Sequence, residues 1–355
     1  MRSLEEIDES ISDLISFLSE NQKKNGSFDM YYLQPHYHPE KSWMNYPAPV
    51  VYNTAQALLP ILKIKSESVK SIVRRAEPYL VQVSLGKKLW TFAPISKDYI
   101  IPYDTDSTSL ASLVLSSLGH KIENKEFLDS IINDHNHYPF YIRNSGNRLP
   151  LTVRLKLNWH NHKMKRSRTL LNDDMRFSDF EFASSCINLL YLGKSEANEK
   201  VWNQLNQEIN EFKIEQLYYI DLIRSFYLCS RTMFNWEGAE ITLKKTVQDE
   251  YFGRLHKALN DSTDSFSRLL VVNSMLFLNR EMDNFNQLIE DCFSSIDKGE
   301  FKLPNAFFSS NKRTDCQPGT EQPNTYFGSP AITCSLYIEF LMMYCKRVFG
   351  SYYGE

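Results

Sequence analysis

The chain has 355 residues, of which 42% are hydrophobic and 23% are charged. This balance is ordinary for a folded globular protein and excludes wholesale disorder. The formal net charge of −3 excludes the basic signature of a nucleic-acid-binding protein.

Features of the first residues and of the cysteines predict a cytoplasmic location. The N-terminus, "MRSLEEIDESISDLISFL", is acidic and amphipathic, unlike a signal peptide. No stretch approaches the ~20 consecutive apolar residues that a membrane span needs. The six cysteines form no C-x-x-C pair, and most lie in apolar helical stretches, as in proteins of a reducing compartment.

Apolar residues recur at helical spacing along nearly the whole chain, and strand-like alternation is scarce. The first helix is expected over residues 4–19, where Ile7, Ile11, Leu14 and Leu18 form one stripe. Further helices are predicted over 52–64, 68–84, 107–119, 125–133, 180–192, 198–212, 217–232, 244–260, 266–279, 283–295 and 329–347. The pattern therefore predicts an all-α protein of about twelve helices in a single domain, 1–355, with a long irregular insertion at about 134–179.

Three predicted helices are followed by a glycine and then an aromatic residue. The pairs are Gly26 with Phe28, Gly86 with Trp90, and Gly299 with Phe301. Glycine supplies the left-handed residue that ends a helix, and repeated helix pairs closed in this way stack into a solenoid or curl into a toroid. Twelve helices suit an (α/α)6 toroid, in which the helix near 4–19 packs beside the helix near 329–347.

Two short motifs carry a family resemblance. "FLSENQKKNGSF" (17–28) resembles the QW motif of squalene and oxidosqualene cyclases, with Phe28 in place of the terminal Trp. "DTDSTS" (104–109) resembles the D-x-D-D motif of class II terpene cyclases, with Ser107 in place of the last Asp. The segment 326–341 is similar to a closing helix in the prenyltransferase and squalene cyclase superfamily. The chain thus resembles class II terpene cyclases, squalene–hopene cyclases included, at the level of its helix pattern.

The resemblance implies an acid-initiated cyclisation. Asp106 matches the proton-donating Asp of the motif, Asp104 its hydrogen-bonded partner, and Ser107 leaves that network without its third carboxylate. Ionising both of two carboxyl groups this close costs free energy, because their negative charges repel, so one of them keeps its proton. The alternative interpretation is a helix N-cap, with Asp106 or Ser107 at the cap and Asp104 placed favourably against the helix dipole. A metal pair is a third, and it lacks a recognisable third ligand.

Aromatic residues near these motifs are candidates for a wall that stabilises a carbocation, because the face of a ring attracts positive charge. Packing between helices is the alternative explanation for each of them. The candidates are Trp43, Tyr46, Tyr52, Trp90, Phe92, Tyr103, Tyr326 and Phe327.

One basic run, "HNHKMKRSR" (160–168), supplies Lys163, Lys165, Arg166 and Arg168 as candidate diphosphate ligands; a solvated loop is the alternative. No metal site and no cofactor are expected, except Mg²⁺ if the substrate is a diphosphate. The expected ligand is a hydrophobic prenyl or terpenoid molecule. A second copy of the chain, or another subunit, is a further candidate partner that would complete the pocket. Two other functions stay open: a non-catalytic toroid that binds a lipid, peptide or protein, and a carbohydrate-active α/α barrel with well-separated carboxylates.

Overall fold

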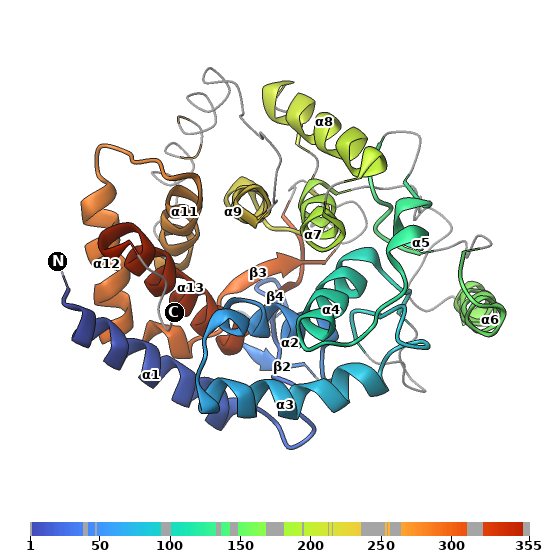
Figure 1. Ribbon diagram of the computed structural model, residues 1–355, viewed down its shortest axis with the longest axis horizontal. Helices are drawn as coiled ribbons and strands as arrows, with labels where there is room; N and C mark the ends of the chain where they lie inside the picture. Colours follow the sequence, from blue (N-terminus) through green and yellow to red (C-terminus); the bar gives the residue numbers. More distant parts are fainter. Residues whose placement is uncertain are drawn as a thin grey trace.

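Helices in two concentric rings make up most of the computed structural model (Figure 1). The structure describes residues 2–37, 42–46, 48–93, 101–132, 136–142, 148–167 (164–167 as backbone only), 181–193, 195–211, 213–214, 216–235, 253, 255, 264–310 and 322–350.

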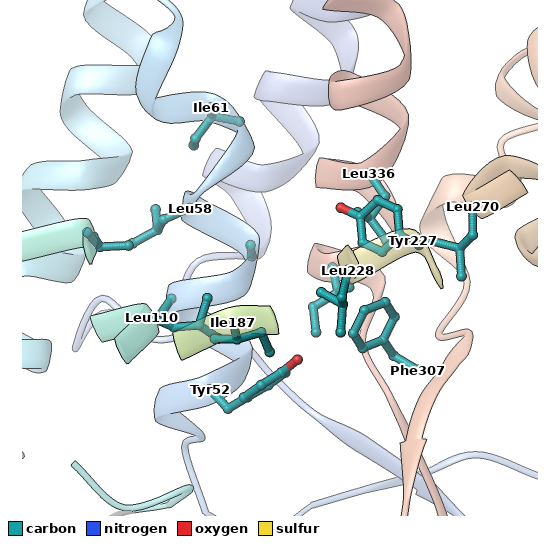
Figure 2. Packing of buried hydrophobic residues seen from close by; sticks show 14 of the residues in the cluster. Tyr52, Leu58, Ile61, Leu110, Ile187, Tyr227, Leu228, Leu270, Phe307 and Leu336 are labelled. Carbon is teal, nitrogen blue, oxygen red and sulfur yellow. The ribbon is translucent and has the colours of Figure 1, made fainter. Parts of the chain in front are cut away.

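Six helices form the inner ring. Each packs against the next in chain order, and the last packs against the first, so the ring is closed. Residues from the second half or the C-cap of every inner helix line one common cavity, which shows that all six helices run in the same direction. Figure 2 shows their apolar side chains filling the interior, among them Leu58, Leu110 and Leu228. The inner helices are α2 (Val51–Leu58), α4 (Thr105–Ser117), α7 (Phe182–Leu192), α9 (Leu222–Asn235), α11 (Ser265–Leu278) and α13 (Pro330–Phe349).

The outer helices differ from the inner ones in how they are buried. All eight residues of α2 are buried, whereas α1 buries only the stripe that includes Ile7, Ile11 and Leu18. A helix that lies between a core and water needs only one apolar face, while a helix enclosed on all sides is buried all round. The outer helices include α1 (Leu4–Asn21), α3 (Glu67–Gln82), α8 (Glu196–Glu211) and α12 (Phe285–Asp297); α5 (Lys125–Asp129), η1 (Pro60–Lys63) and η2 (Glu300–Lys302) are short.

The two ends of the ring meet. Helix α1 packs along α13, and the thiol of Cys334 donates to the carbonyl oxygen of Leu14 at 3.2 Å. The Phe17 ring lies edge-on against Phe301, with centroids 5.3 Å apart. The prediction that the first and last helices are neighbours in a closed toroid is confirmed.

A small sheet is the main departure from the all-α prediction. Its strands are β1 (Tyr31–Leu33), β2 (Met44–Asn45), β3 (Ala306–Ser309) and β4 (Tyr326–Gly328). The strands pair antiparallel in the order β2-β1-β4-β3. Strands of two to four residues are too short to leave an alternating pattern in the sequence. Because β4 leads directly into α13, the sheet lies at the end of the ring where the inner helices begin.

Some predicted boundaries also change. The stretch 134–179, expected to be irregular, contains helix α6 (Leu151–Ser167). Its apolar residues occur at every second position from 151 to 159, which hides the helical period. The helix predicted over 217–232 begins only at Leu222, and the helix predicted over 244–260 lies almost wholly outside the described residues.

The glycine turns were predicted with the right conformation but not always the right role. Gly26 has φ of +87°, yet α1 already ends at Asn21, so Gly26 does not terminate this helix. A Cβ atom at Gly26 would lie 1.9 Å from the carbonyl oxygen of Arg75 in α3. Glycine is therefore required there for close approach as well as for its φ angle.

Candidate active site

The aspartate pair lies at the start of inner helix α4. Asp104 is the N-cap residue, and its Oδ1 accepts a hydrogen bond from the Ser107 N–H at 2.7 Å. Both carboxyl groups are almost inaccessible: Asp104 is 1% and Asp106 4% exposed. The pair does cap the helix, but the cap is Asp104 and not Asp106 or Ser107 as the alternative interpretation expected; Asp106 and Ser107 belong to the first turn.

Asp106 is surrounded by hydrogen-bond donors. Its Oδ1 accepts from the Ser107 N–H at 2.9 Å. Its Oδ2 accepts from the Tyr219 hydroxyl at 3.3 Å and, at the limit of hydrogen-bond distance, from the Ser184 hydroxyl at 3.5 Å. The Tyr219 hydroxyl also lies 2.8 Å from the Tyr52 hydroxyl. A carboxylate at Asp106 would therefore be stabilised by donors from three elements.

Burial raises the pKa of both aspartates, but not equally. For Asp104 the pKa is well above its usual range, because burial, the charge of Asp106 and a hydrogen bond with Asp106 all favour the protonated form. Burial also raises the pKa of Asp106, while hydrogen bonds from Asp104, Ser107 and Tyr219 oppose that rise. Asp106 has donors to both carboxylate oxygens, whereas Asp104 has one to its Oδ1 alone, so hydrogen bonding favours the carboxylate form more at Asp106 than at Asp104.

Glu181, which no sequence motif indicated, holds Tyr219 in place. Its Oε1 accepts from three consecutive N–H groups, those of Leu217, Tyr218 and Tyr219, at 3.2, 2.9 and 2.8 Å. Glu181 is fully buried, and burial together with the charge of Asp106 raises its pKa to about 7. It is the N-cap residue of α7, as Asp104 is the N-cap residue of α4, and an acidic residue ahead of an apolar run was a signal available in the sequence.

Aromatic rings gather beside the pair, and some were predicted. Tyr52, Phe92 and Phe308 lie in mutual contact, with Phe308 centroids 5.3 Å from each of the other two. Phe327 stacks on Phe308 at 5.4 Å, and Tyr46 lies at its far side, 6.0 Å away. The wall thus includes the predicted Tyr46, Tyr52, Phe92 and Phe327, and the unpredicted Phe308 is at its centre.

Other predicted aromatic residues have different contacts. Trp90 is fully buried, and its indole N–H donates to the Leu80 carbonyl. Tyr103 packs against His160 of α6, with ring centroids 4.9 Å apart. Trp43 lies over Gly328, and the Tyr326 hydroxyl donates to Gln322.

A second aromatic group lies beside Asp104 and was not predicted. Phe140 stacks on Tyr218 at 4.1 Å, and the hydroxyls of Tyr141 and Tyr218 lie 2.8 Å apart. Tyr141 bridges to Asp104 through the backbone. The residues of this group are distant in sequence and come from irregular segments, so helical periodicity gave no signal for them.

The proposed diphosphate ligands lie on or beyond α6. Lys163 is exposed, with its Nζ 3.9 Å from the centre of the Trp159 ring. The side chains of Lys165 and Arg166, and all of Arg168, lie outside the described residues. Within the described part of the chain, no cluster of His, Cys, Asp and Glu suits a metal ion, and a Mg²⁺ requirement remains a prediction.

A cavity of about 330 Å³ lies at the opposite end of the ring from the aspartates. Its lining is mainly apolar, but it includes Arg231 and Glu339, which form a buried ion pair at 2.9 Å. Tyr227 donates to the same carboxylate. The cavity is separate from the aspartate pair, because it is lined by the second halves of the inner helices.

The fold is that of a class II terpene cyclase. Two solved structures of the type II terpene cyclase MstE from Scytonema, both of variants, align with 97% of this chain and 98% of their own, each with a TM-score of 0.61. One is an apo structure at 11% sequence identity. The other, at 10%, is an Asp-to-Asn variant in complex with its substrate, geranylgeranyl dihydroxybenzoate. The sequence matches no protein-family model and no curated protein.

Proposed function

We propose that this protein is a class II terpene cyclase-like enzyme that starts the cyclisation of a linear prenyl substrate by protonating it. The observation that carries the proposal is the buried pair Asp104 and Asp106, of which Asp106 has donors on both carboxylate oxygens. Protonating an alkene requires an acid that keeps its proton away from water and whose conjugate base is stabilised when the proton leaves.

In the proposed step, Asp106 gives its proton to one carbon of a double bond. The π electron pair forms the new C–H bond, the other carbon becomes a carbocation, and Asp106 becomes a carboxylate. Asp104 stays protonated and donates to that carboxylate, with Tyr219 and the Ser107 N–H as further donors. Such preorganised donors stabilise charge that develops during the reaction.

The aromatic wall would guide the cation that forms. Tyr52 joins the two parts of the site, since its hydroxyl contacts Tyr219 and its ring contacts Phe92 and Phe308. Ring faces stabilise cations without acting as nucleophiles. Similarity to a type II terpene cyclase of nearly the same chain length supports the view that one toroid is large enough for this chemistry.

The test compares wild type, Asp106→Asn and Asp104→Asn with linear farnesyl and geranylgeranyl substrates, including geranylgeranyl dihydroxybenzoate, in H₂O and D₂O. Wild type should form cyclic products that carry one solvent deuterium at the protonated carbon. Product formation by Asp106→Asn should fall by at least about a hundredfold, because Asn cannot supply the proton. Asp264→Asn is the matched control, since Asp264 caps inner helix α11 as Asp104 caps α4.

Two outcomes would contradict the proposal. Product formation by Asp106→Asn at the wild-type rate would exclude Asp106 as the acid. Absence of product from the wild type with every substrate, combined with a substrate-induced rise in Tm, would favour the non-catalytic binding toroid.

A further inference from the structure

Helix α6 lies outside the two rings of helices, beyond α4 and α5 (Figure 1). One of its faces is fixed to the body of the protein. Val153, Leu157 and His160 are buried, and the His160 Nε2–H donates to the Ile101 carbonyl at 2.9 Å. The His160 ring packs on Tyr103, the residue directly before Asp104. The helix is therefore anchored beside the segment that leads into the aspartate pair.

The opposite face of α6 is apolar and exposed. Leu151, Leu155 and Trp159 are each 60% exposed. Residues four positions apart lie on the same side of a helix, so these three side chains form one stripe. Single exposed apolar residues need no explanation, but three large ones along one helix face cost free energy in water and indicate a surface that becomes covered.

Cations flank this stripe. Lys156 and Lys163 are exposed and lie roughly 40–60° round the helix from Trp159, at 3.6 residues per turn. From 135 to 172 the sequence has eight Lys and Arg residues and no Asp or Glu, although the whole chain carries a net charge of −3. All charged residues of this window are cations, of which Arg148 pairs with Glu126 of α5 at 3.7 Å; the exposed Lys156 and Lys163 beside the stripe are complementary to an anionic surface.

We infer that α6 docks the protein on the surface of an anionic phospholipid bilayer. An interfacial helix places Leu and Trp at the boundary between headgroups and acyl chains, while Lys side chains extend to the phosphates. The docking that we infer is peripheral, because an amphipathic helix of this kind lies in the plane of the interface; none of the helices in the described part of the chain is long and apolar enough to cross a bilayer. The inference does not depend on the proposed function, although it would bring the aspartate end of the ring close to membrane-dissolved prenyl chains.

The experiment is co-sedimentation of the full chain with phosphatidylcholine vesicles, with and without phosphatidylglycerol. Wild type should bind the anionic vesicles, and binding should weaken as salt is added. Leu155→Ser/Trp159→Ser should lower the partition coefficient by about tenfold or more, because both apolar contacts with the bilayer are lost. Lys156→Glu/Lys163→Glu should lower it by at least about fivefold for each lysine.

The controls use residues of the same type elsewhere on the surface. Leu303 is 58% exposed, so Leu303→Ser should leave vesicle binding unchanged, as should Lys298→Glu at the end of α12. Thermal unfolding of every variant checks that it is folded. These substitutions remove exposed apolar groups or change exposed charges, and we expect little change in Tm.

Three results would overturn the inference. They are full binding by Leu155→Ser/Trp159→Ser, an equal loss of binding by Leu303→Ser, and a wild type that does not bind anionic vesicles. A wild-type dimer in sedimentation velocity that Leu155→Ser/Trp159→Ser converts to a monomer would instead assign this face to a second copy of the chain.

Discussion

Replacing Gly26 with alanine would place a methyl group against the backbone of α3. The new Cβ would lie 1.9 Å from the Arg75 carbonyl oxygen and 2.9 Å from the Ala76 Cα. An ordinary contact needs about 3.5 Å, so the loop after α1 and helix α3 would have to separate by roughly 1.5 Å. This loop and helix are also joined through Gln22, whose amide donates to the carbonyls of Gly26 and Ile72, each at 2.9 Å.

Three contributions set the magnitude. A non-glycine residue with φ near +87° costs about 1 kcal/mol. Forcing a group into a packed interface costs about 1–3 kcal/mol, and weakening the two Gln22 hydrogen bonds costs about 1 kcal/mol more. We expect Gly26→Ala to lower the free energy of unfolding by about 3–5 kcal/mol.

Gly119→Ala is the matched control. Gly119 has the same φ of +87°, but no heavy atom lies within 4 Å of its Cβ position, so we expect a loss of about 1 kcal/mol. Urea unfolding of both variants, followed by circular dichroism, measures the difference. Equal losses in the two variants would refute the close approach of Gly26 to α3, whereas a much larger loss in Gly26→Ala would support it.

Three further predictions concern the candidate site. Burial raises the pKa of Glu181 from its ordinary 4.5 to about 7, so the contribution of Glu181 to stability is complete below pH about 4.5 and is lost as the pH rises through about 7. The free energy of unfolding should fall by about 3 kcal/mol over this window. Urea titrations should show a smaller fall for Glu181→Gln. Tyr219→Phe should lower the rate of product formation about tenfold or more, because it removes one donor to the Asp106 carboxylate, while Tyr138→Phe should leave the rate unchanged. Asp104→Asn should retain the helix cap and keep Tm within a few degrees of wild type, but its rate of product formation should fall, and a wild-type rate would contradict the partner role of Asp104.

The ring of helices could be predicted from the sequence, because helical periodicity is a local signal repeated many times. The aspartate pair could be found because its two members are one residue apart in a short motif. Tyr219 could not be found in this way. Tyr219 falls inside the range 217–232 that the periodicity assigned to a helix, and its contact with Asp106 joins residues 113 positions apart in sequence.

Long-range contacts also explain why the sequence indicated some of the aromatic residues beside the aspartate pair and not others. Proximity to the motifs selected Tyr52 and Phe92, which lie beside the pair, but it also selected Trp90, which is fully buried and donates its indole N–H to the Leu80 carbonyl. Phe308 comes from a strand of four residues in the C-terminal quarter of the chain. Nothing near it in sequence connects it with Asp106.

The common direction of the inner helices gives the ring an electrical polarity along its axis. Each helix carries about half a positive charge at its N-terminus and half a negative charge at its C-terminus, and here six N-termini point to the same end. That end holds the carboxyl groups of Asp104, Asp106 and Glu181, whereas Arg231 and Lys63 border the cavity at the other. The carboxyl groups thus lie where the helix dipoles favour their ionised form, and the cations lie where the dipoles favour positive charge, so the side chains at the two ends offset the polarity of the ring.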